Sequence, residues 1–414
     1  MSKQLSKTPP LWIMITREMP CRFATGKNRR LAAIAEALIQ AGVRLECHHI
    51  SDSHEIRKPH DLELWKSFEK TVLWRVNQKD DPGSPEDLGE GVEFRSAQNV
   101  AIGLAGELEG AELEGIIFTS LETVTAAWKS LPQHVLRILE SDELESSRAR
   151  EFSLIENSVI TEMERKSFIA KRMLEKQWIP QFDLVAFSSA KEMSKAVDQI
   201  QAPEANLTVW PNVVPEPPTP VSRHVPDTPV FLFVGHLGYP PNQDGLIWFA
   251  EVILPLILES EPDAILRIIG QRCPDSLAKR LDRPGVENLG AQPTLGEYYA
   301  SATAAIIPLR AGTGTRIKIL EAFSFLCPVI STSKGADGLS VSGGKELFLA
   351  DDPADFSDAC LSLFRDRSLG EKVAVEGCRF WRNGFTREIL DKIISLSLSK
   401  LKGGTVLRTS RLDE

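Results

Sequence analysis

The sequence predicts two α/β domains in tandem, each built on a parallel β-sheet. At 414 residues the chain is longer than one ordinary hydrophobic core supports. Short apolar runs recur along both halves and alternate with helix-like segments, which is the pattern of a doubly wound α/β fold. A stretch with seven prolines, residues 211–229, separates two groups of these runs. So many prolines exclude a helix or a central strand, so we expect an extended connection there.

The N-terminal half begins as a strand, helix and strand. The apolar run Leu11–Thr16 is followed by a polar loop containing Gly26, a helical pattern that ends at Gly42, and strand-like residues at Val43–Ile50. This order implies parallel strands joined by a right-handed crossover. Residues 51–110 give no clear pattern. Further strands are predicted at Gly115–Ser120, Val135–Leu139, Asp183–Ser188 and Leu207–Trp210.

After the Pro-rich stretch the pattern starts again. Strands are predicted at Val230–Gly235, Ile265–Gly270, Ala304–Leu309 and Cys327–Thr332. Two such domains leave a cleft that faces the carboxyl ends of both sheets, where α/β proteins bind ligands. The predicted division is residues 1–210 for the first domain, 211–229 for the linker, 230–384 for the second domain and 385–414 for a terminal helix.

Bulk properties exclude several classes of protein. The net charge of −9 argues against nonspecific nucleic-acid binding, which needs a broad basic surface. The six cysteines form no CxxC pair, so neither a zinc site nor a disulfide framework has local support. No signal-peptide core and no apolar stretch of about eighteen residues occurs. We therefore expect a cytoplasmic protein that is soluble or peripheral at the inner membrane face.

The most informative segment runs from Pro308 to Leu339. Gly312 and Gly314 permit a tight turn after a predicted strand, and the residues from Arg316 onward have helical spacing. A helix N-terminus with Arg316 and Lys318 suits a diphosphate group. Glu321, about one turn further on, is placed to bind a pair of hydroxyl groups. Spacing alone leaves an alternative open, in which the glycines only form a turn and these charged side chains are solvated.

This segment resembles the donor-binding segment of glycosyltransferase family four. That family carries the pattern P-L-x-x-G-x-G-x-x-x-K-x-x-E-A followed by P-V-I-x-T-x-x-G. The matching residues are Pro308, Leu309, Gly312, Gly314, Lys318, Glu321, Ala322, Pro328, Val329, Thr332 and Gly335. The resemblance implies that the loop amides and the lysine hold the donor diphosphate and that the glutamate binds the nucleotide ribose. The resemblance therefore implies these roles for Gly312, Gly314, Thr315, Lys318 and Glu321.

Other fragments resemble the same family in order and spacing, from about Phe231 to Phe385. The segment that begins FVGHLG has Gly235, Gly238 and Asn242 in matching places, and Gly270 ends the next strand. The resemblance implies the GT-B fold, with two Rossmann-like domains facing a cleft. It also implies that the terminal helix crosses back to the first domain, although a plain amphipathic helix explains those residues equally well.

Two departures from the family pattern concern the donor site. Many members place a glutamate eight positions before Glu321, where it contacts the donor sugar, but this chain has Thr313. We interpret this as the feature of a branch that uses backbone groups instead. His236 stands where an arginine is usual, so phosphate charge must come from Arg316 or from the first domain. The candidates there are Thr25, Gly26, Lys27 and Arg30, for which a solvent-exposed basic turn is the alternative.

A third departure lies at the end of a predicted strand in the first domain. The segment VLRILESDE resembles the family's I-L-D-x-H-D stretch, and Asp142 occupies the place of the histidine. Glu140 and Glu143 flank it. A carboxylate cluster that faces a pocket can orient sugar hydroxyls or raise the pKa of its members. A solvated acidic helix start is the equal alternative.

Other charged segments receive no catalytic role. The acidic pairs Asp80–Asp81 and Asp351–Asp352 do not resemble a metal site at a strand end, and we predict no metal. The basic helix from Arg165 to Lys176 presents a charged face, for which contact with anionic lipid is an open alternative to simple solvation.

The resemblance implies a retaining, metal-independent glycosyltransferase. It would move a sugar from a nucleotide sugar to an acceptor hydroxyl, as in polysaccharide or glycoconjugate synthesis. The acceptor would be a carbohydrate, a lipid-linked glycan or a small molecule, and no cofactor beyond the donor substrate is implied. The predicted catalytic residues are Asp142, Arg316, Lys318 and Glu321.

Two other functions remain open from the sequence. Because Thr313 and Asp142 replace expected side chains, one is a catalytically silent GT-B scaffold that binds a nucleotide sugar. The other is a nucleotide-sugar epimerase on the same fold. An NAD-dependent dehydrogenase is disfavoured because no GxGxxG follows the first strand.

Overall fold

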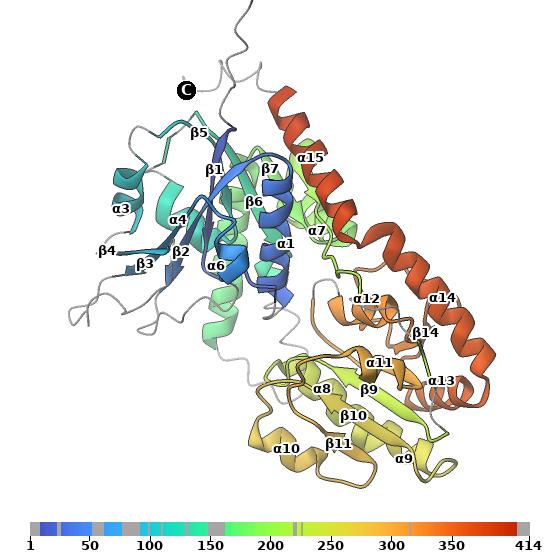
Figure 1. The fold of residues 1–414 in the computed structure, drawn as a ribbon. Coiled ribbons are helices and arrows are strands. Elements are labelled where there is room, and N and C mark those ends of the chain that lie inside the picture. The colour runs from blue at the N-terminus through green and yellow to red at the C-terminus, as the bar shows by residue number, and fades with distance from the viewer. Residues whose placement is uncertain are drawn as a thin grey trace, which may run out of the picture.

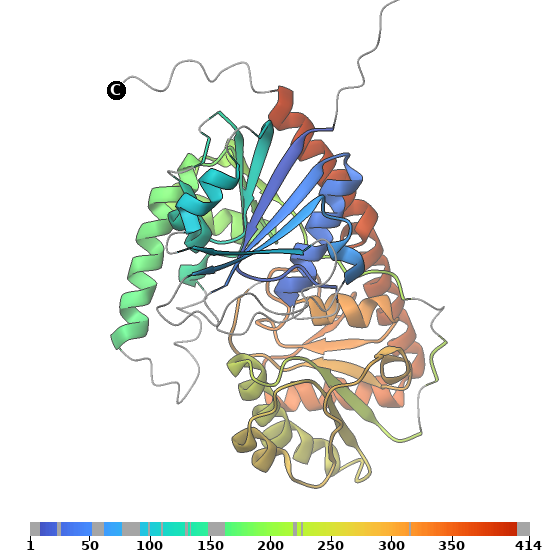
Figure 2. The ribbon, with the colours of Figure 1, turned by 60° about the vertical axis from the view of Figure 1, so that its left-hand side comes forward.

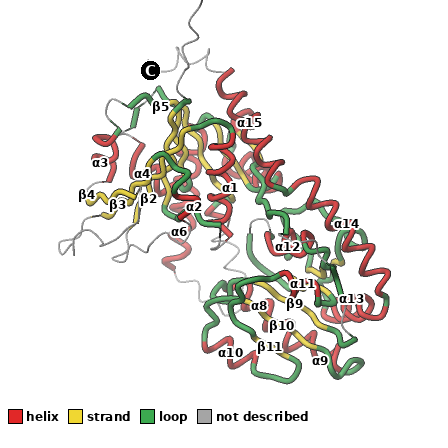
Figure 3. Tube along the Cα trace, viewed as in Figure 1, coloured by secondary structure: helices red, strands yellow, loops and turns green. Residues whose placement is uncertain are grey.

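The computed structural model describes residues 9–22, 26–51, 62–76, 92–97, 100–108, 111–128, 131–132, 134–147, 162–217, 222–224, 227–313 and 316–403. Within them the chain forms two parallel sheets, one above the other in Figure 1. Helices cover both sheets, and Figure 3 shows helix and strand alternating along the chain. The predicted doubly wound α/β architecture is confirmed.

The first sheet has the strand order β4-β3-β2-β1-β5-β6-β7-β8. Its strands are β1 (Leu11–Thr16), β2 (Arg44–Ser51), β3 (Lys70–Val76), β4 (Val92–Ala97), β5 (Leu113–Phe118), β6 (Leu136–Asp142), β7 (Leu184–Phe187) and β8 (Leu207–Val209). Its helices are α1 (Gly26–Gln40), α2 (Leu62–Trp65), α3 (Val100–Glu107), α4 (Leu121–Ala127), α6 (Glu162–Trp178) and α7 (Ala190–Ile200), with short turns η2 (Ile179–Gln181) and η3 (Glu204–Asn206).

Strands β3 and β4 lie within residues 51–110, whose sequence has no clear periodic pattern. They are parallel to β2 and extend the sheet on one side. Strand β6 runs on to Asp142, three residues beyond its predicted end. This extension matters for function because it places Glu140 and Asp142 on the strand rather than at the start of a solvated helix.

Apolar side chains fill both faces of the first sheet. One core contains Ile13 and Phe118, together with residues of α4 and α7. The other contains Trp12 and Met14, together with residues of α1. Successive residues of β1 therefore point into opposite cores, as the pleat requires. Helices α6 and α15 lie on opposite sides of this sheet (Figure 2).

The second sheet has the strand order β11-β10-β9-β12-β13-β14. Its strands are β9 (Val230–Val234), β10 (Ile265–Ile269), β11 (Val286–Asn288), β12 (Ala304–Ile307), β13 (Val329–Ser331) and β14 (Phe348–Leu349). Its helices are α8 (Pro240–Trp248), α9 (Leu254–Leu258), α10 (Asp275–Leu281), α11 (Gly296–Ala300), α12 (Ile317–Ser324), α13 (Pro353–Arg365) and α14 (Arg367–Gly384); the π-helical turn η4 (Phe249–Ile253) joins α8 to α9.

The last helix, α15 (Arg387–Gly403), returns to the first unit. Leu390, Ile394 and Leu398 are buried in the same core as α1. The indole Nε1 of Trp210 donates a hydrogen bond of 3.2 Å to Ser397 Oγ. In Figure 1 α14 and α15 run along one side of both units.

The chain passes between the two units twice, and the two connecting segments are hydrogen-bonded to each other. On the outward crossing, the amide of Val214 donates a hydrogen bond of 3.0 Å to the carbonyl of Phe385, which lies on the return crossing. The Trp381 indole donates in turn to the Val214 carbonyl, at 3.1 Å.

The strand orders identify where ligands should bind. In each sheet the chain turns back beside its first strand, at β1 and β5 in the first sheet and at β9 and β12 in the second. Ligands of such folds bind beyond the carboxyl ends of the strands at this point. In the part of the chain that the structure describes, no helix is long and apolar enough to cross a membrane.

Candidate functional site

The loop after β12 makes a turn that requires glycine. Gly312 has φ +107°, a conformation that side chains rarely adopt. A Cβ atom at this position would lie 3.2 Å from the Arg316 guanidinium and 3.3 Å from the Tyr239 hydroxyl. The absence of a side chain therefore leaves room for Arg316 to lie against the loop. Gly314 and Thr315, which the sequence also places in the donor site, lie outside the described residues.

Arg316 precedes α12, and its buried guanidinium lacks a full set of partners among the described residues. Its NH1 donates a hydrogen bond of 2.8 Å to the Thr313 carbonyl. Its Nε and NH2 atoms, and the Thr313 hydroxyl, are buried and have no hydrogen-bond partner within the described structure. Leaving buried donors of a cationic group unpaired is strongly unfavourable, so native structures usually supply a partner. An anion at this position would supply one.

Lys318 lies in the first turn of α12 and contacts side chains of β9 and α8. Its Nζ donates a 2.7 Å hydrogen bond to Asn242 Oδ1, and Asn242 Nδ2 donates to the His236 carbonyl at 2.8 Å. The ammonium lies 4.4 Å from the centre of the Phe233 ring. Burial, with a smaller contribution from the nearby Arg316 cation, lowers the pKa of Lys318 from 10.5 to about 7. Near pH 7 both the charged and the neutral form of this buried lysine are therefore populated.

This lowered pKa predicts a pH dependence of anion binding. Because only protonated Lys318 attracts a diphosphate, affinity for a nucleoside diphosphate should be highest below pH 7 and should fall as the pH rises to about 9. A bound anion stabilises the ammonium, so binding near pH 8 should take up a proton. Calorimetry at pH 8 in buffers of different ionisation enthalpy measures this uptake. Lys318→Arg, whose charge does not titrate in this range, is the control and should show little uptake from this site.

Glycines bring the loops after β9 and β10 close together. A Cβ atom on Gly270 would lie 2.0 Å from the Gly235 carbonyl oxygen, and one on Gly238 would lie 3.4 Å from the Arg272 carbonyl oxygen. Burial and the neighbouring Arg272 cation lower the pKa of His236, so it is neutral at pH 7. His236 therefore cannot supply the charge of the arginine usual at its position.

Glu321 contacts two residues that the sequence pattern does not indicate, Tyr299 and Arg29. The buried Tyr299 hydroxyl donates to its Oε2 at 3.2 Å, and Arg29 NH1 lies 3.3 Å from its Oε1. Burial, followed by the Glu321 charge, raises the pKa of Tyr299, so the phenol stays protonated and donates. Arg29 comes from α1 of the first unit. No local motif connects positions so distant in the sequence, and only the fold could show these contacts.

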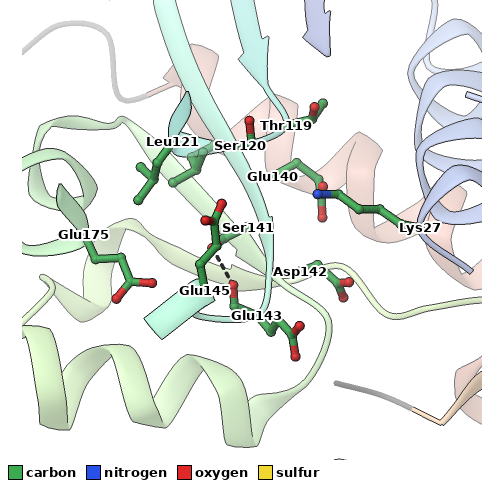
Figure 4. A pocket seen from close by; sticks show the side chains of 11 residues that line it. Lys27, Thr119, Ser120, Leu121, Glu140, Ser141, Asp142, Glu143, Glu145 and Glu175 are labelled. Carbon is green, nitrogen blue, oxygen red and sulfur yellow. Dashed lines mark hydrogen bonds between the residues drawn. The ribbon is translucent and has the colours of Figure 1, made fainter. Parts of the chain in front are cut away.

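A pocket opens at the carboxyl ends of β5 and β6 in the first unit (Figure 4). Carboxylates and hydroxyls dominate its lining, and Lys27 adds one amine. The lining residues are Lys27, Thr119, Ser120, Leu121, Leu139, Glu140, Ser141, Asp142, Glu143, Glu145 and Glu175. The predicted cleft residues Lys27, Glu140, Asp142 and Glu143 therefore do lie together.

Arg30 differs from the expectation that it serves as a phosphate ligand or as part of an exposed basic turn. It is buried, and its Nε lies 2.6 Å from Glu140 Oε1 and 3.7 Å from Asp142 Oδ1. Its NH1 donates to the Trp210 carbonyl at 2.7 Å. Arg30 thus anchors the carboxylates that face the pocket. Burial raises the pKa of Glu140, and the Arg30 cation opposes this rise.

Asp142 ends β6 in a left-handed conformation, with φ +50°. Such backbone strain in a residue other than glycine often marks a functional site. The side chain is 24% exposed, whereas Glu140 is only 1% exposed. The buried oxygens Glu140 Oε2 and Asp142 Oδ1 and the Thr119 hydroxyl accept or donate no hydrogen bond within the described residues. A solvated acidic helix start, the alternative left open by the sequence, is therefore wrong for Glu140 and Glu143, which are both buried.

Some predicted features lie apart from these sites or outside the described residues. Gly26 begins α1, whereas Thr25 and the pair Asp80–Asp81 are not described. Asp351 binds the backbone and hydroxyl of Ser333, and Asp352 caps α13. Among the residues that the structure describes, no group of three acidic, His or Cys side chains is arranged to hold a metal ion.

Two basic side chains of α6 bind other groups of the protein. Lys171 lies 3.3 Å from Glu145, and Arg172 donates to the Gln199 carbonyl at 3.4 Å. Ile169 and Met173 are exposed on the same helix. The face is therefore mixed rather than uniformly basic.

Comparison with known sequences points to the second unit. Residues 228–366 match the model of the family described as Glycosyl transferases group 1. A protein of Klebsiella pneumoniae, described as an uncharacterized 44.6 kDa protein in the cps region, is 27% identical over 163 residues. That match covers 37% of this chain and 42% of the relative, so it spans less than half of either protein.

Solved structures match nearly the whole chain at low identity. HepE of Anabaena in complex with UDP has a TM-score of 0.68 at 13% identity, over 94% of this chain and 100% of that chain. Sucrose-phosphate synthase of Thermosynechococcus elongatus has a TM-score of 0.67 at 13% identity, over 95% and 99%. TarM of S. aureus, in a complex that contains UDP, has a TM-score of 0.66 at 11% identity, over 95% and 99%. At these identities the likeness is one of fold.

Proposed function

We propose that this chain is a glycosyltransferase that transfers a sugar from a nucleotide-sugar donor to an acceptor hydroxyl with retention of anomeric configuration. Its fold is that of the GT-B structures, and residues 228–366 match the Glycosyl transferases group 1 model. The observation that carries the proposal is the buried Arg316 guanidinium beside Lys318 at the start of α12, two of whose nitrogens have no hydrogen-bond partner in the part of the chain that the structure describes. An anionic diphosphate fits these donors. Because HepE is solved with UDP and with UDP-glucose, uridine nucleotides are the donors to test first.

The proposed donor roles follow from the contacts around α12. Arg316, Lys318 and the Thr313 hydroxyl bind the diphosphate, and Glu321 binds the ribose hydroxyls. During transfer the bond from the anomeric carbon to the phosphate oxygen breaks, and negative charge develops on the leaving diphosphate. Fixed cations and dipoles that are already oriented stabilise this charge without reorganising. These side chains supply the positive charge that a metal ion would otherwise supply.

Retention requires the acceptor to attack the face of the sugar that the diphosphate leaves. In the proposed mechanism the acceptor oxygen bonds to the anomeric carbon, and its proton passes to the leaving phosphate oxygen. A protein base on the opposite face is then unnecessary. Strong stabilisation of the diphosphate, the role given to Arg316 and Lys318, favours this course.

We assign the acceptor to the pocket in the first unit. Carboxylate oxygens accept hydrogen bonds, so Glu140 Oε2 and Asp142 Oδ1 suit hydroxyl groups of the acceptor. Several carboxylates and a single lysine line the pocket, which disfavours a phosphate or carboxylate group there. A neutral glycan is therefore the proposed acceptor. The Klebsiella pneumoniae relative from the cps region supports a role in polysaccharide synthesis.

Contact with a membrane is a further part of the proposal. Exposed Ile169 and Met173 lie on α6 with Lys176, an arrangement that suits the interface of an anionic bilayer. This contact would bring a lipid-linked glycan to the protein.

One assay tests the proposed reaction, its stereochemistry and its metal independence. The protein is incubated with α-linked uridine diphosphate sugars and a panel of glycan acceptors in excess EDTA, and the new linkage is read by proton NMR. We expect an α-linked product. A β-linked product would refute retention, and turnover that requires added magnesium or manganese would refute the metal-free site. A sugar nucleotide product without transfer would identify an epimerase, and binding without turnover would identify a silent scaffold.

A further inference from the structure

The two units meet where α1 approaches the start of α12. A Cβ atom on Gly26, the first residue of α1, would lie only 3.1 Å from Ile317 Cδ1, so the helices approach closely there. Three residues further along α1, Arg29 reaches Glu321 on α12 with an ion pair of 3.3 Å. Arg29 of the first unit thus contacts Glu321 of the second unit, the carboxylate to which we assign the ribose.

The contacts with Arg29 and Tyr299 leave little of the Glu321 carboxylate accessible to a ligand. Tyr299 occupies Oε2 from the buried side, and Arg29 occupies Oε1 from the side of the first unit. With both partners present, the Glu321 side chain is 12% exposed, whereas Arg29 is 28% exposed. Of the two partners, Tyr299 is fully buried and fixed, while Arg29 retains contact with solvent. Arg29 is therefore the partner that a ligand can displace.

We infer that Arg29 occupies the ribose position on Glu321 in the ligand-free protein, and that nucleotide binding must break this contact between the two units. The inference rests on the proposed function, in which Glu321 binds the ribose hydroxyls. Arg29 then lowers nucleotide affinity and holds the ligand-free units together. It is a residue of the nucleotide site that comes from the opposite unit.

The expected effect is modest because the ion pair is partly exposed. Pairs of this kind contribute little, since solvent screens the charges and both side chains lose rotational freedom. Their typical strength corresponds to about a two- to fivefold change in an equilibrium constant. Removing Arg29 should therefore tighten nucleotide binding by about two- to fivefold. The direction is diagnostic, because removal of an arginine that binds the nucleotide would weaken binding instead.

The test is calorimetric titration of UDP, GDP and ADP into the full chain and into its Arg29→Gln variant. We expect a lower dissociation constant for the nucleotide that binds best. Arg22→Gln is the matched control, because Arg22 also lies in the first unit but pairs with Glu63, at 3.2 Å. The nucleotide affinity of this variant should equal that of the unchanged protein. Arg29→Lys keeps the charge but loses the planar donor group, so its dissociation constant for the nucleotide should lie between those of the unchanged protein and Arg29→Gln.

A double-mutant cycle separates this inference from the proposed function. Glu321→Gln should weaken nucleotide binding, and in that background Arg29→Gln should have no further effect. Unchanged or weaker binding in the single Arg29→Gln variant, with a folded protein by thermal melting, overturns the inference and leaves the proposed function intact. Unchanged binding in Glu321→Gln refutes the ribose assignment, and with it the inference. If no nucleotide binds the unchanged protein, the proposed function itself fails.

Discussion

Replacing Arg316 with Ala should lower kcat/KM for the nucleotide-sugar donor by about 10- to 150-fold. The guanidinium is buried and already oriented by its bond to the Thr313 carbonyl, so the lost contact is a charge-assisted hydrogen bond of about 1.5–3 kcal/mol. Lys318→Ala should cause a loss of similar size, larger at pH 6 than at pH 8.5 because its pKa is about 7. Steady-state rates with varied donor measure both effects.

Arg310→Ala is the matched control for this experiment. Arg310 lies in the same loop, but it pairs with Asp244 at 2.6 Å and is well exposed. Its replacement should change kcat/KM less than threefold. Equal losses in the Arg310 and Arg316 variants would show that the loop has been disturbed as a whole, and would contradict the assignment of Arg316 to the diphosphate.

Replacing Arg30 with Met should lower the free energy of unfolding by about 3–5 kcal/mol, because it leaves the Glu140 carboxylate buried without its cation. Both side chains are only 1% exposed, so water cannot take over the role of the guanidinium. Without Arg30 the pKa of Glu140 should rise further, so the loss should be smaller at pH 5 than at pH 8. Urea unfolding at the two pH values measures this difference.

The double variant Arg30→Met/Glu140→Leu provides the control. It removes both charges and restores an apolar pair, so most of the lost stability should return. If the double variant is as unstable as the single one, the lost contacts to Trp210 and Asn212 would account for the effect instead.

The sequence predicted the parts of the fold that carry continuous apolar runs. Strands such as Leu11–Thr16 and Val230–Val234 are buried on both faces and therefore stand out as uninterrupted apolar segments. Strand β4 at the edge of the sheet alternates apolar and polar residues over Val92–Arg95, and β3 beside it has only the short apolar run Val72–Trp74, so neither stands out as a long apolar segment. Lys70 and Arg95 there form ion pairs with Glu107 on α3.

The candidate site was predictable only where its residues are close in sequence. Gly312, Lys318 and Glu321 lie within one short segment, so a single pattern could indicate them. Arg29 and Tyr299 contact Glu321 from elements far away along the chain, and no spacing rule connects them. Arg30 is a related case: its charge indicates an exposed turn, but its partner Glu140, which accounts for its burial, is 110 positions away in the sequence.

The chain leaves the first unit near Val214 and returns to it after Phe385, so the second unit is an insertion into the first in topological terms. Its first and last residues lie beside each other, and α15 completes the core of the unit from which the chain set out. Adjacent ends are typical of domains that evolution inserts into a host. The two connections touch at these hydrogen bonds, so a rotation of the second unit would pivot there, and the parts of that unit farthest from the pivot would move most.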